Sequence, residues 1–118
     1  MAATTEMIPE IRRITQAIRR YAESVHWSPN DYRIFVRPNW DWGRINIILA
    51  AREFPDGPED PRPSIRSFLE RDLKDAPELF RAIGLTVSTF EQIRRGGLHG
   101  IPEAYEELPQ PLGPGPAA

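Results

Sequence analysis

The first part of the chain carries apolar residues with the spacing of a helix. Pro9 fits the first helical turn, where a missing N–H leaves no intrahelical bond unmade. Residues that recur at intervals of three and four would form one apolar stripe; they are Met7, Ile11, Ile14, Ile18, Tyr21 and Val25. Arginines 12, 13, 19 and 20 fall on the opposite side. The pattern predicts a helix over residues 8–25 that buries one face.

The pattern then changes from helical to alternating. In residues 32–37, Tyr32, Ile34 and Val36 would face one side of a strand, and the residues between them the other. Residues 38–43 read as a turn that contains Gly43, and residues 44–54 as a longer strand. An isolated hairpin is marginal in water, so we expect the helix to cover one face of it.

The second half predicts short helices separated by proline and glycine. Residues 55–63 hold four prolines and read as a stiff exposed loop. Ser64 would cap one helix, and a second would run from Asp75 to Ile83 and end at Gly84. Residues 85–90 are ambiguous: β-branched side chains favour a short strand at 85–88, whereas Ser88 and Glu91 have the spacing of a capping box. We favour a helix over 87–95 and keep a third strand as the alternative.

The last residues are rich in proline. Residues 101–118 contain five prolines, and such a segment buries too little apolar area to offset its ordering entropy. We therefore expect one α+β domain over residues 1–100 and a tail over 101–118 that folding does not need, with Tyr105 and Leu108 as its best anchors. The domain would be an N-terminal helix packed on a two-stranded antiparallel hairpin, followed by two or three short helices.

Composition narrows the classes of function. A chain of 118 residues supports one hydrophobic core, and without cysteine it has no disulfides and no thiolate chemistry. A net charge of −2 gives no general attraction to nucleic acids or anionic membranes. The longest apolar run, residues 47–51, is far shorter than the roughly 20 residues that cross a bilayer. The first residues show no export signal, so we expect a cytoplasmic protein with no membrane partner.

Candidate chemistry is sparse. His26 and His99 are isolated, and neither belongs to a metal-binding motif. The acidic residues at 53, 56, 59 and 60 do not have the spacing of a calcium loop. Gly96 and Gly97 lack the lysine of a phosphate loop. The sequence therefore predicts no catalytic residues, no cofactor and no metal site, and we expect a protein that is not an enzyme.

The hairpin face away from the helix is the main candidate surface. Arginine and aromatic residues are enriched where proteins meet. The residues of this surface and its turn are Arg33, Phe35, Arg37, Trp40, Trp42, Arg44, Ile48 and Arg52. We expect a protein-protein interaction or adaptor module, with a second copy of the chain as an alternative partner. Two other readings stay open: a platform for single-stranded nucleic acid, or a face covered by the tail or a later helix.

Residues 79–95 carry the most specific local pattern. Apolar residues at 79, 83, 85, 90 and 93 flank Gly84, and the segment resembles a helix-turn-helix unit. That resemblance implies DNA binding through the second helix, whose DNA-binding residues would be Ser88, Gln92, Arg94 and Arg95. The flanks carry Asp72, Asp75 and Glu78, which would repel phosphates. DNA binding is therefore the alternative function.

Overall fold

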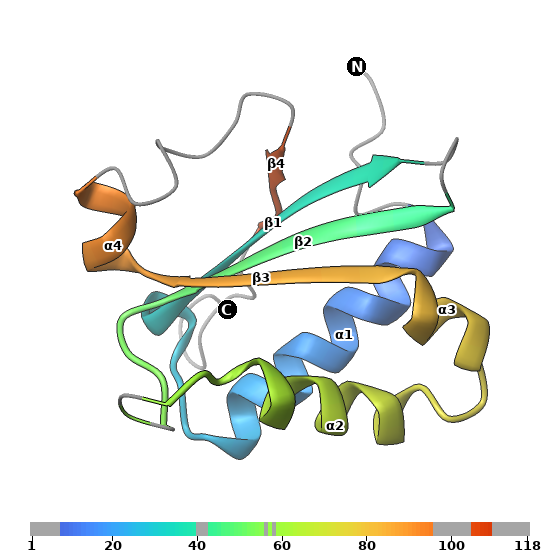
Figure 1. Cartoon of the computed structure of the whole chain (residues 1–118), viewed down its shortest axis with the longest axis horizontal. Coiled ribbons are helices and arrows are strands. Elements are labelled where there is room, and N and C mark those ends of the chain that lie inside the picture. The colour runs from blue at the N-terminus through green and yellow to red at the C-terminus, as the bar shows by residue number, and fades with distance from the viewer. Residues whose placement is uncertain (1–7, 40–42, 56, 58, 96–104, 110–118) are drawn as a thin grey trace, which may run out of the picture.

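A computed structural model describes residues 8–39, 43–55, 57, 59–95 and 105–109 (Figure 1). The helices are α1 (Pro9–Ser24), α2 (Arg62–Asp72), α3 (Pro77–Ala82) and α4 (Phe90–Arg94), with a 3₁₀ turn, η2 (Pro29–Asp31). The strands are β1 (Tyr32–Asn39), β2 (Arg44–Ala51), β3 (Ile83–Thr89) and β4 (Glu106–Glu107). The α+β class predicted from the sequence is confirmed.

The four strands form one mixed sheet in the order β3-β2-β1-β4. The hairpin strands β1 and β2 are antiparallel, with Phe35 opposite Ile48, and β4 pairs antiparallel with β1. Strand β3 is parallel to β2, with Leu85 opposite Ile47. Parallel neighbours need a crossover connection. Here α2 and α3 supply it, on the same side of the sheet as α1 (Figure 1).

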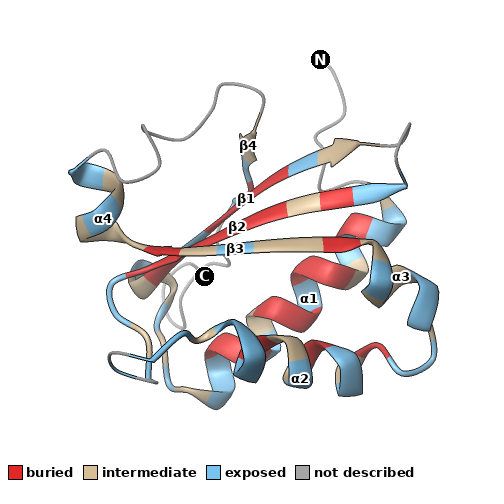
Figure 2. Cartoon of the chain, viewed as in Figure 1, coloured by how far each residue is buried: buried red, intermediate tan, exposed pale blue. Residues whose placement is uncertain are grey.

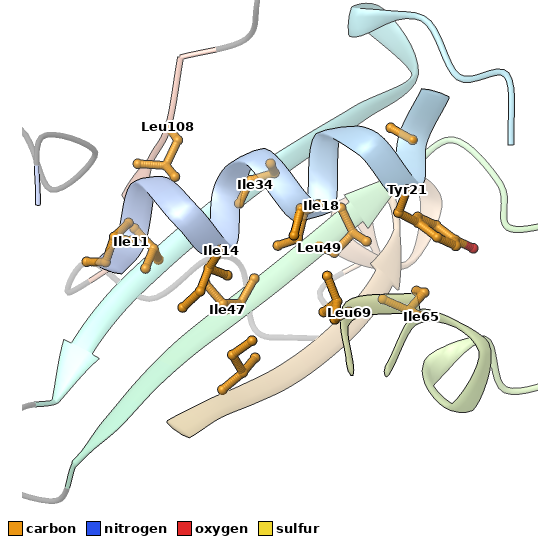
Figure 3. Close-up of a cluster of buried hydrophobic side chains, with 14 of the residues drawn as sticks. Ile11, Ile14, Ile18, Tyr21, Ile34, Ile47, Leu49, Ile65, Leu69 and Leu108 are labelled. Carbon is orange, nitrogen blue, oxygen red and sulfur yellow. The ribbon is translucent and has the colours of Figure 1, made fainter. Parts of the chain in front are cut away.

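The predicted N-terminal helix is confirmed within one residue at each end. Its apolar stripe is buried against the sheet (Figures 2 and 3), and Ile11, Ile14 and Ile18 are 0% exposed. Helix α1 ends before His26, which has a φ of 63°. A left-handed backbone cannot continue an α-helix, so the chain turns here toward β1.

The antiparallel pairing of the two hairpin strands and the alternation of their residues are confirmed, but the hairpin belongs to a four-stranded sheet and is not the two-stranded unit that was predicted. The side chains of Tyr32, Ile34 and Val36 belong to the core beneath α1. Gly43 precedes β2 with a φ of 63°, a conformation that favours glycine. Strand β2 ends at Ala51 rather than near Phe54. Phe54 leaves the sheet and packs edge-on against Trp27, with ring centroids 5.6 Å apart.

The preferred helix over residues 87–95 is wrong in its first part. Helix α3 ends at Ala82, and residues 83–89 form a strand, longer than the third strand kept as the alternative. The capping box lies one residue later than expected: Gln92 N–H donates to Thr89 Oγ1 (3.1 Å), and Thr89 N–H donates to Gln92 Oε1 (2.8 Å). The edge of β2 offers a full ladder of hydrogen bonds, so the β-branched residues before Thr89 extend along it.

Part of the tail belongs to the folded unit, which corrects the expectation that it adds nothing to the core. Strand β4 pairs with β1 at Phe35 and Val36. Leu108 is 0% exposed within the main core, and its N–H donates to the Ile34 carbonyl at 2.9 Å. These contacts satisfy part of the outer edge of β1, at residues 34–36. A domain boundary at residue 100 therefore leaves out residues that pack in the core. Residues 101–104 and 110–118 lie outside the described part of the chain.

Candidate functional site

The two faces of the sheet are covered to different extents. On one face, α1 and α2 bury the main core. On the other, a small cluster of Phe35, Ile48 and Ala50 packs against Phe90 and Ile93 of α4 and against Tyr105. The predicted parity of the hairpin is correct, because Phe35 and Ile48 face one another on the side away from α1.

Two of the candidate partner-binding residues are not accessible. Phe35 is 8% exposed and Ile48 is 3% exposed. The reading in which a later helix and the tail cover this face is therefore correct for these two side chains. The arginines at 33, 37, 44 and 52 remain exposed around the covered centre. Trp40 and Trp42 lie outside the described residues.

A groove runs beside α4 on this face. It encloses about 460 Å³ and is partly open to solvent. Its lining is mostly apolar with charged residues at the margins: Arg33, Phe35, Ala50, Phe90, Ile93, Arg94 and Glu107. We call this the α4 groove. It joins residues that are close to 75 positions apart in the sequence, from β1 to β4.

The local structure of Ser88 to Gln92 positions the wall of the α4 groove. The capping box at Thr89 turns the chain out of β3 and starts α4. Ser88, only 4% exposed, donates from Oγ to Gln92 Oε1 at 3.2 Å. Phe90 and Ile93 are three residues apart on a helix and so share the face that points back toward the sheet.

Two arginines bracket the aromatic ring of that wall. The guanidinium carbons of Arg33 and Arg52 lie 5.8 Å and 5.9 Å from the centroid of Phe90. Contacts of this kind are attractive because the ring face carries partial negative charge. They hold Phe90 between strand β1 and the residue that follows β2, with Arg33 in the lining of the groove.

The rim of the groove carries a small excess of positive charge. Arg33 Nε lies 3.7 Å from a Glu107 oxygen, and Arg52 Nε lies 3.3 Å from an Asp31 oxygen. Arg94 and Arg95 both pair with the Glu91 carboxylate. The groove lining itself holds two guanidiniums, of Arg33 and Arg94, and one carboxylate, of Glu107. The arginine side chains are 61–77% exposed, and a guanidinium has five N–H donors, so each keeps donor capacity for a further carboxylate.

A second cavity lies at the end of the sheet near His26. It encloses about 450 Å³ and is lined by Val25, His26, Trp27, Asp31, Arg52, Glu53, Phe54, Pro55 and Gly57. Its main carboxylate already has a structural role, because the Ser28 backbone N–H donates to Asp31 at 2.8 Å. That hydrogen bond, with those from the Ser28 hydroxyl and Arg52, holds the pKa of Asp31 below its usual range. A carboxyl kept ionised in this way is poorly suited to proton transfer near neutral pH.

The residues of the proposed DNA-reading helix do not form one. Residues 79–95 fold as helix, strand and helix, so the helix-turn-helix interpretation is wrong. Ser88 is buried in β3, and Gln92 caps α4. Arg94 and Arg95 pair with Glu91 on a helix of five residues. No recognition helix is therefore present in this segment.

Several residues of the α4 groove were missed by sequence reasoning. Phe90 and Ile93 have helical spacing, but the sequence does not say which face of the sheet they cover. Glu107 reaches the groove only because β4 joins the sheet. Among the described residues, no group of three or more acidic or histidine side chains could hold a metal ion. Within the same residues, no helix has the length and apolar character to span a membrane.

Comparison of the chain with protein-family models, with curated proteins and with solved structures finds no match.

Proposed function

We propose that the chain is a non-enzymatic interaction module whose α4 groove binds a short segment of another protein. The bound segment inserts an apolar side chain between α4 and the sheet and places a carboxylate at the rim. The observation that carries this proposal is the groove itself, a cavity of about 460 Å³ whose lining is mostly apolar and includes the exposed Arg33 and Arg94.

The apolar part of the groove supplies the anchoring contact. Ile93 and Phe90 are half-buried, so each still exposes apolar surface above Phe35 and Ala50. Burying one apolar side chain from a partner there gains about 1.5–3 kcal/mol. Arginine and aromatic residues at the edge of such a pocket are typical of the residues that dominate binding energy.

The charged rim supplies the preference for an acidic partner. Arg33 and Arg94 line the groove, and their carboxylate partners are themselves exposed. A partner carboxylate can approach either guanidinium without the burial of an unpaired charge. Surface pairs of this kind add modest affinity and mainly accelerate and orient association.

Selection from a displayed peptide library tests the proposal. The full chain is immobilised, and enriched peptides are synthesised with a fluorescent label for anisotropy titrations. We expect enriched peptides to combine a large apolar residue with a nearby Asp or Glu. Ile93→Asp should weaken their binding by about tenfold or more, because a single buried contact is commonly worth over 1 kcal/mol. Arg94→Glu should weaken binding by a smaller factor that shrinks at high salt.

Arg12→Glu is the matched control, since Arg12 is exposed on α1 and lies on the other side of the sheet. It makes the same charge change and should leave peptide affinity unaltered. Unchanged melting temperatures would show that the groove variants are folded. Failure to enrich any apolar-acidic peptide, or equal binding by Ile93→Asp and wild type, would overturn the proposal. Saturable binding of duplex DNA at physiological salt would instead support DNA binding as the function.

A further inference from the structure

The two edges of the sheet are protected very differently. Strand β4 at one edge has two residues, both glutamates. Short, charged edge strands are a common way to prevent unwanted strand pairing. Strand β3 at the other edge has seven residues, Ile-Gly-Leu-Thr-Val-Ser-Thr, with no proline, lysine or other charge (Figure 1). Within the described residues, nothing pairs with its outer side in the sheet.

Strand β3 also exposes apolar surface beside this edge. Leu85 and Val87 lie on the helix side of the strand, where they are only half-buried against the main core. Thr86 lies between them on the other side of the strand and is exposed. The edge therefore combines a strand-forming sequence with half-covered apolar side chains.

We infer that β3 pairs antiparallel with β3 of a second copy of the chain, which joins two four-stranded sheets into one of eight strands. The two-fold axis passes through Thr86, the midpoint of the strand. This register pairs all seven residues of one copy with all seven of the other. The inference concerns a surface separate from the α4 groove, so either can fail without the other.

The sequence of β3 is complementary to itself in this register. On the helix side, Leu85 of each copy lies opposite Val87 of the other, which gives two apolar cross-strand pairs. On the opposite side, the two Thr86 residues face one another. Apolar and Thr–Thr pairs are among the cross-strand combinations that stabilise sheets.

An unrelated strand would pair with the same backbone edge, but nothing in its sequence would have to satisfy the Leu85–Val87 and Thr86–Thr86 pairs. These self-complementary pairs favour a second copy.

Sedimentation equilibrium over a range of concentrations, with Thr86→Lys and Thr86→Glu variants, tests the inference. We expect wild type to dimerise reversibly, because a single strand pair is a small interface. Each variant alone should raise the dissociation constant by about tenfold or more, because two like charges then meet on the axis. An equimolar mixture of the two variants should dimerise again. Gln16→Lys adds the same charge on exposed α1 and should dimerise like wild type.

A wild type that stays monomeric at all concentrations would overturn the inference, as would dimers that persist in both variants or a mixture that does not associate. Thr86 is exposed, so both variants should keep the melting temperature of the monomer. If either fails to fold, hydrogen exchange of the wild type decides instead. Protection of β3 amides that rises with protein concentration supports the pairing, and protection independent of concentration refutes it.

Discussion

Leu108 offers the sharpest test of how the C-terminal segment contributes to the fold. Its side chain is 0% exposed and belongs to the same buried cluster as Ile11 and Ile34 (Figure 3). Its N–H donates to the Ile34 carbonyl, and Arg19 donates to the carbonyl of Pro109 next to it. Leu108→Ala keeps these backbone bonds and removes only the buried side-chain atoms. The substitution therefore isolates the packing of the tail.

The expected loss of stability in Leu108→Ala follows from the complete burial of the leucine side chain. Truncating a buried leucine to alanine lowers the free energy of unfolding by about 2–5 kcal/mol. Leu108 lies beside the short strand β4, where neighbours can partly close the cavity, so we expect about 3 kcal/mol. For a domain of this length the melting temperature falls by about 4 °C per kcal/mol, which gives a shift of about 12 °C.

Urea denaturation followed by circular dichroism measures this change directly, with thermal unfolding as a second readout. Glu107→Ala is the matched control: the residue is adjacent, exposed and paired with Arg33 at 3.7 Å. An exposed pair contributes little, so this control should change stability by about 0.5 kcal/mol or less. A chain ending at residue 104 should lose at least as much stability as Leu108→Ala. Equal, small effects in Leu108→Ala and Glu107→Ala would refute the placement of Leu108 in the core.

Two further predictions concern α1. Ile14→Asp places an unpaired carboxylate at a position that is 0% exposed and should lower the free energy of unfolding by about 3 kcal/mol or more. Its control, Arg12→Asp on the exposed face, should change the free energy of unfolding by about 0.5 kcal/mol or less. Similar urea midpoints for the two variants would contradict the packing of α1. The Arg13 guanidinium, which donates to Asp75 at 2.8 Å, holds the pKa of Asp75 below its usual 3.8. The folded state therefore binds this proton less readily than the unfolded state, so the stabilisation is complete above the usual carboxyl pKa and disappears as the pH falls through the lowered value. Asp75→Asn should melt below wild type at neutral pH and match it in strong acid; a gap that persists or widens in acid would rule out this linkage.

Some features of the fold are determined by short stretches of the sequence. The buried face of α1 and the parity of the hairpin follow from spacings that contiguous residues impose on a helix or a strand. Ile14 and Ile18 on α1, like Ile34 and Val36 on β1, could be assigned to one core because residues at these spacings share a face of a helix or a strand. The exposed arginines of the opposite hairpin face could be identified by the same reasoning.

Only part of the candidate site could be predicted from the sequence, because local spacing places some of its residues and pairing between distant segments places the others. Arg33 and Arg52 could be placed on one face of the hairpin from their parity. Phe90 and Ile93 could not be placed over that face, because their position depends on where β3 ends and α4 begins. Glu107 joins the groove only through the pairing of β4 with β1.

Tertiary structure decided the state of residues 83–89 and of residues 105–109. Residues 85–90 carry both strand-forming side chains and a capping pattern, so local preference is nearly balanced. The balance is broken by the free edge of β2, where Ile47 meets Leu85 across 38 positions of the chain. Leu108 is held in the same way, by a hydrogen bond to Ile34 and a space under α1. Hydrogen bonds and burial supplied by distant segments outweigh local propensities of a few tenths of a kcal/mol per residue, and no short window of sequence contains those partners.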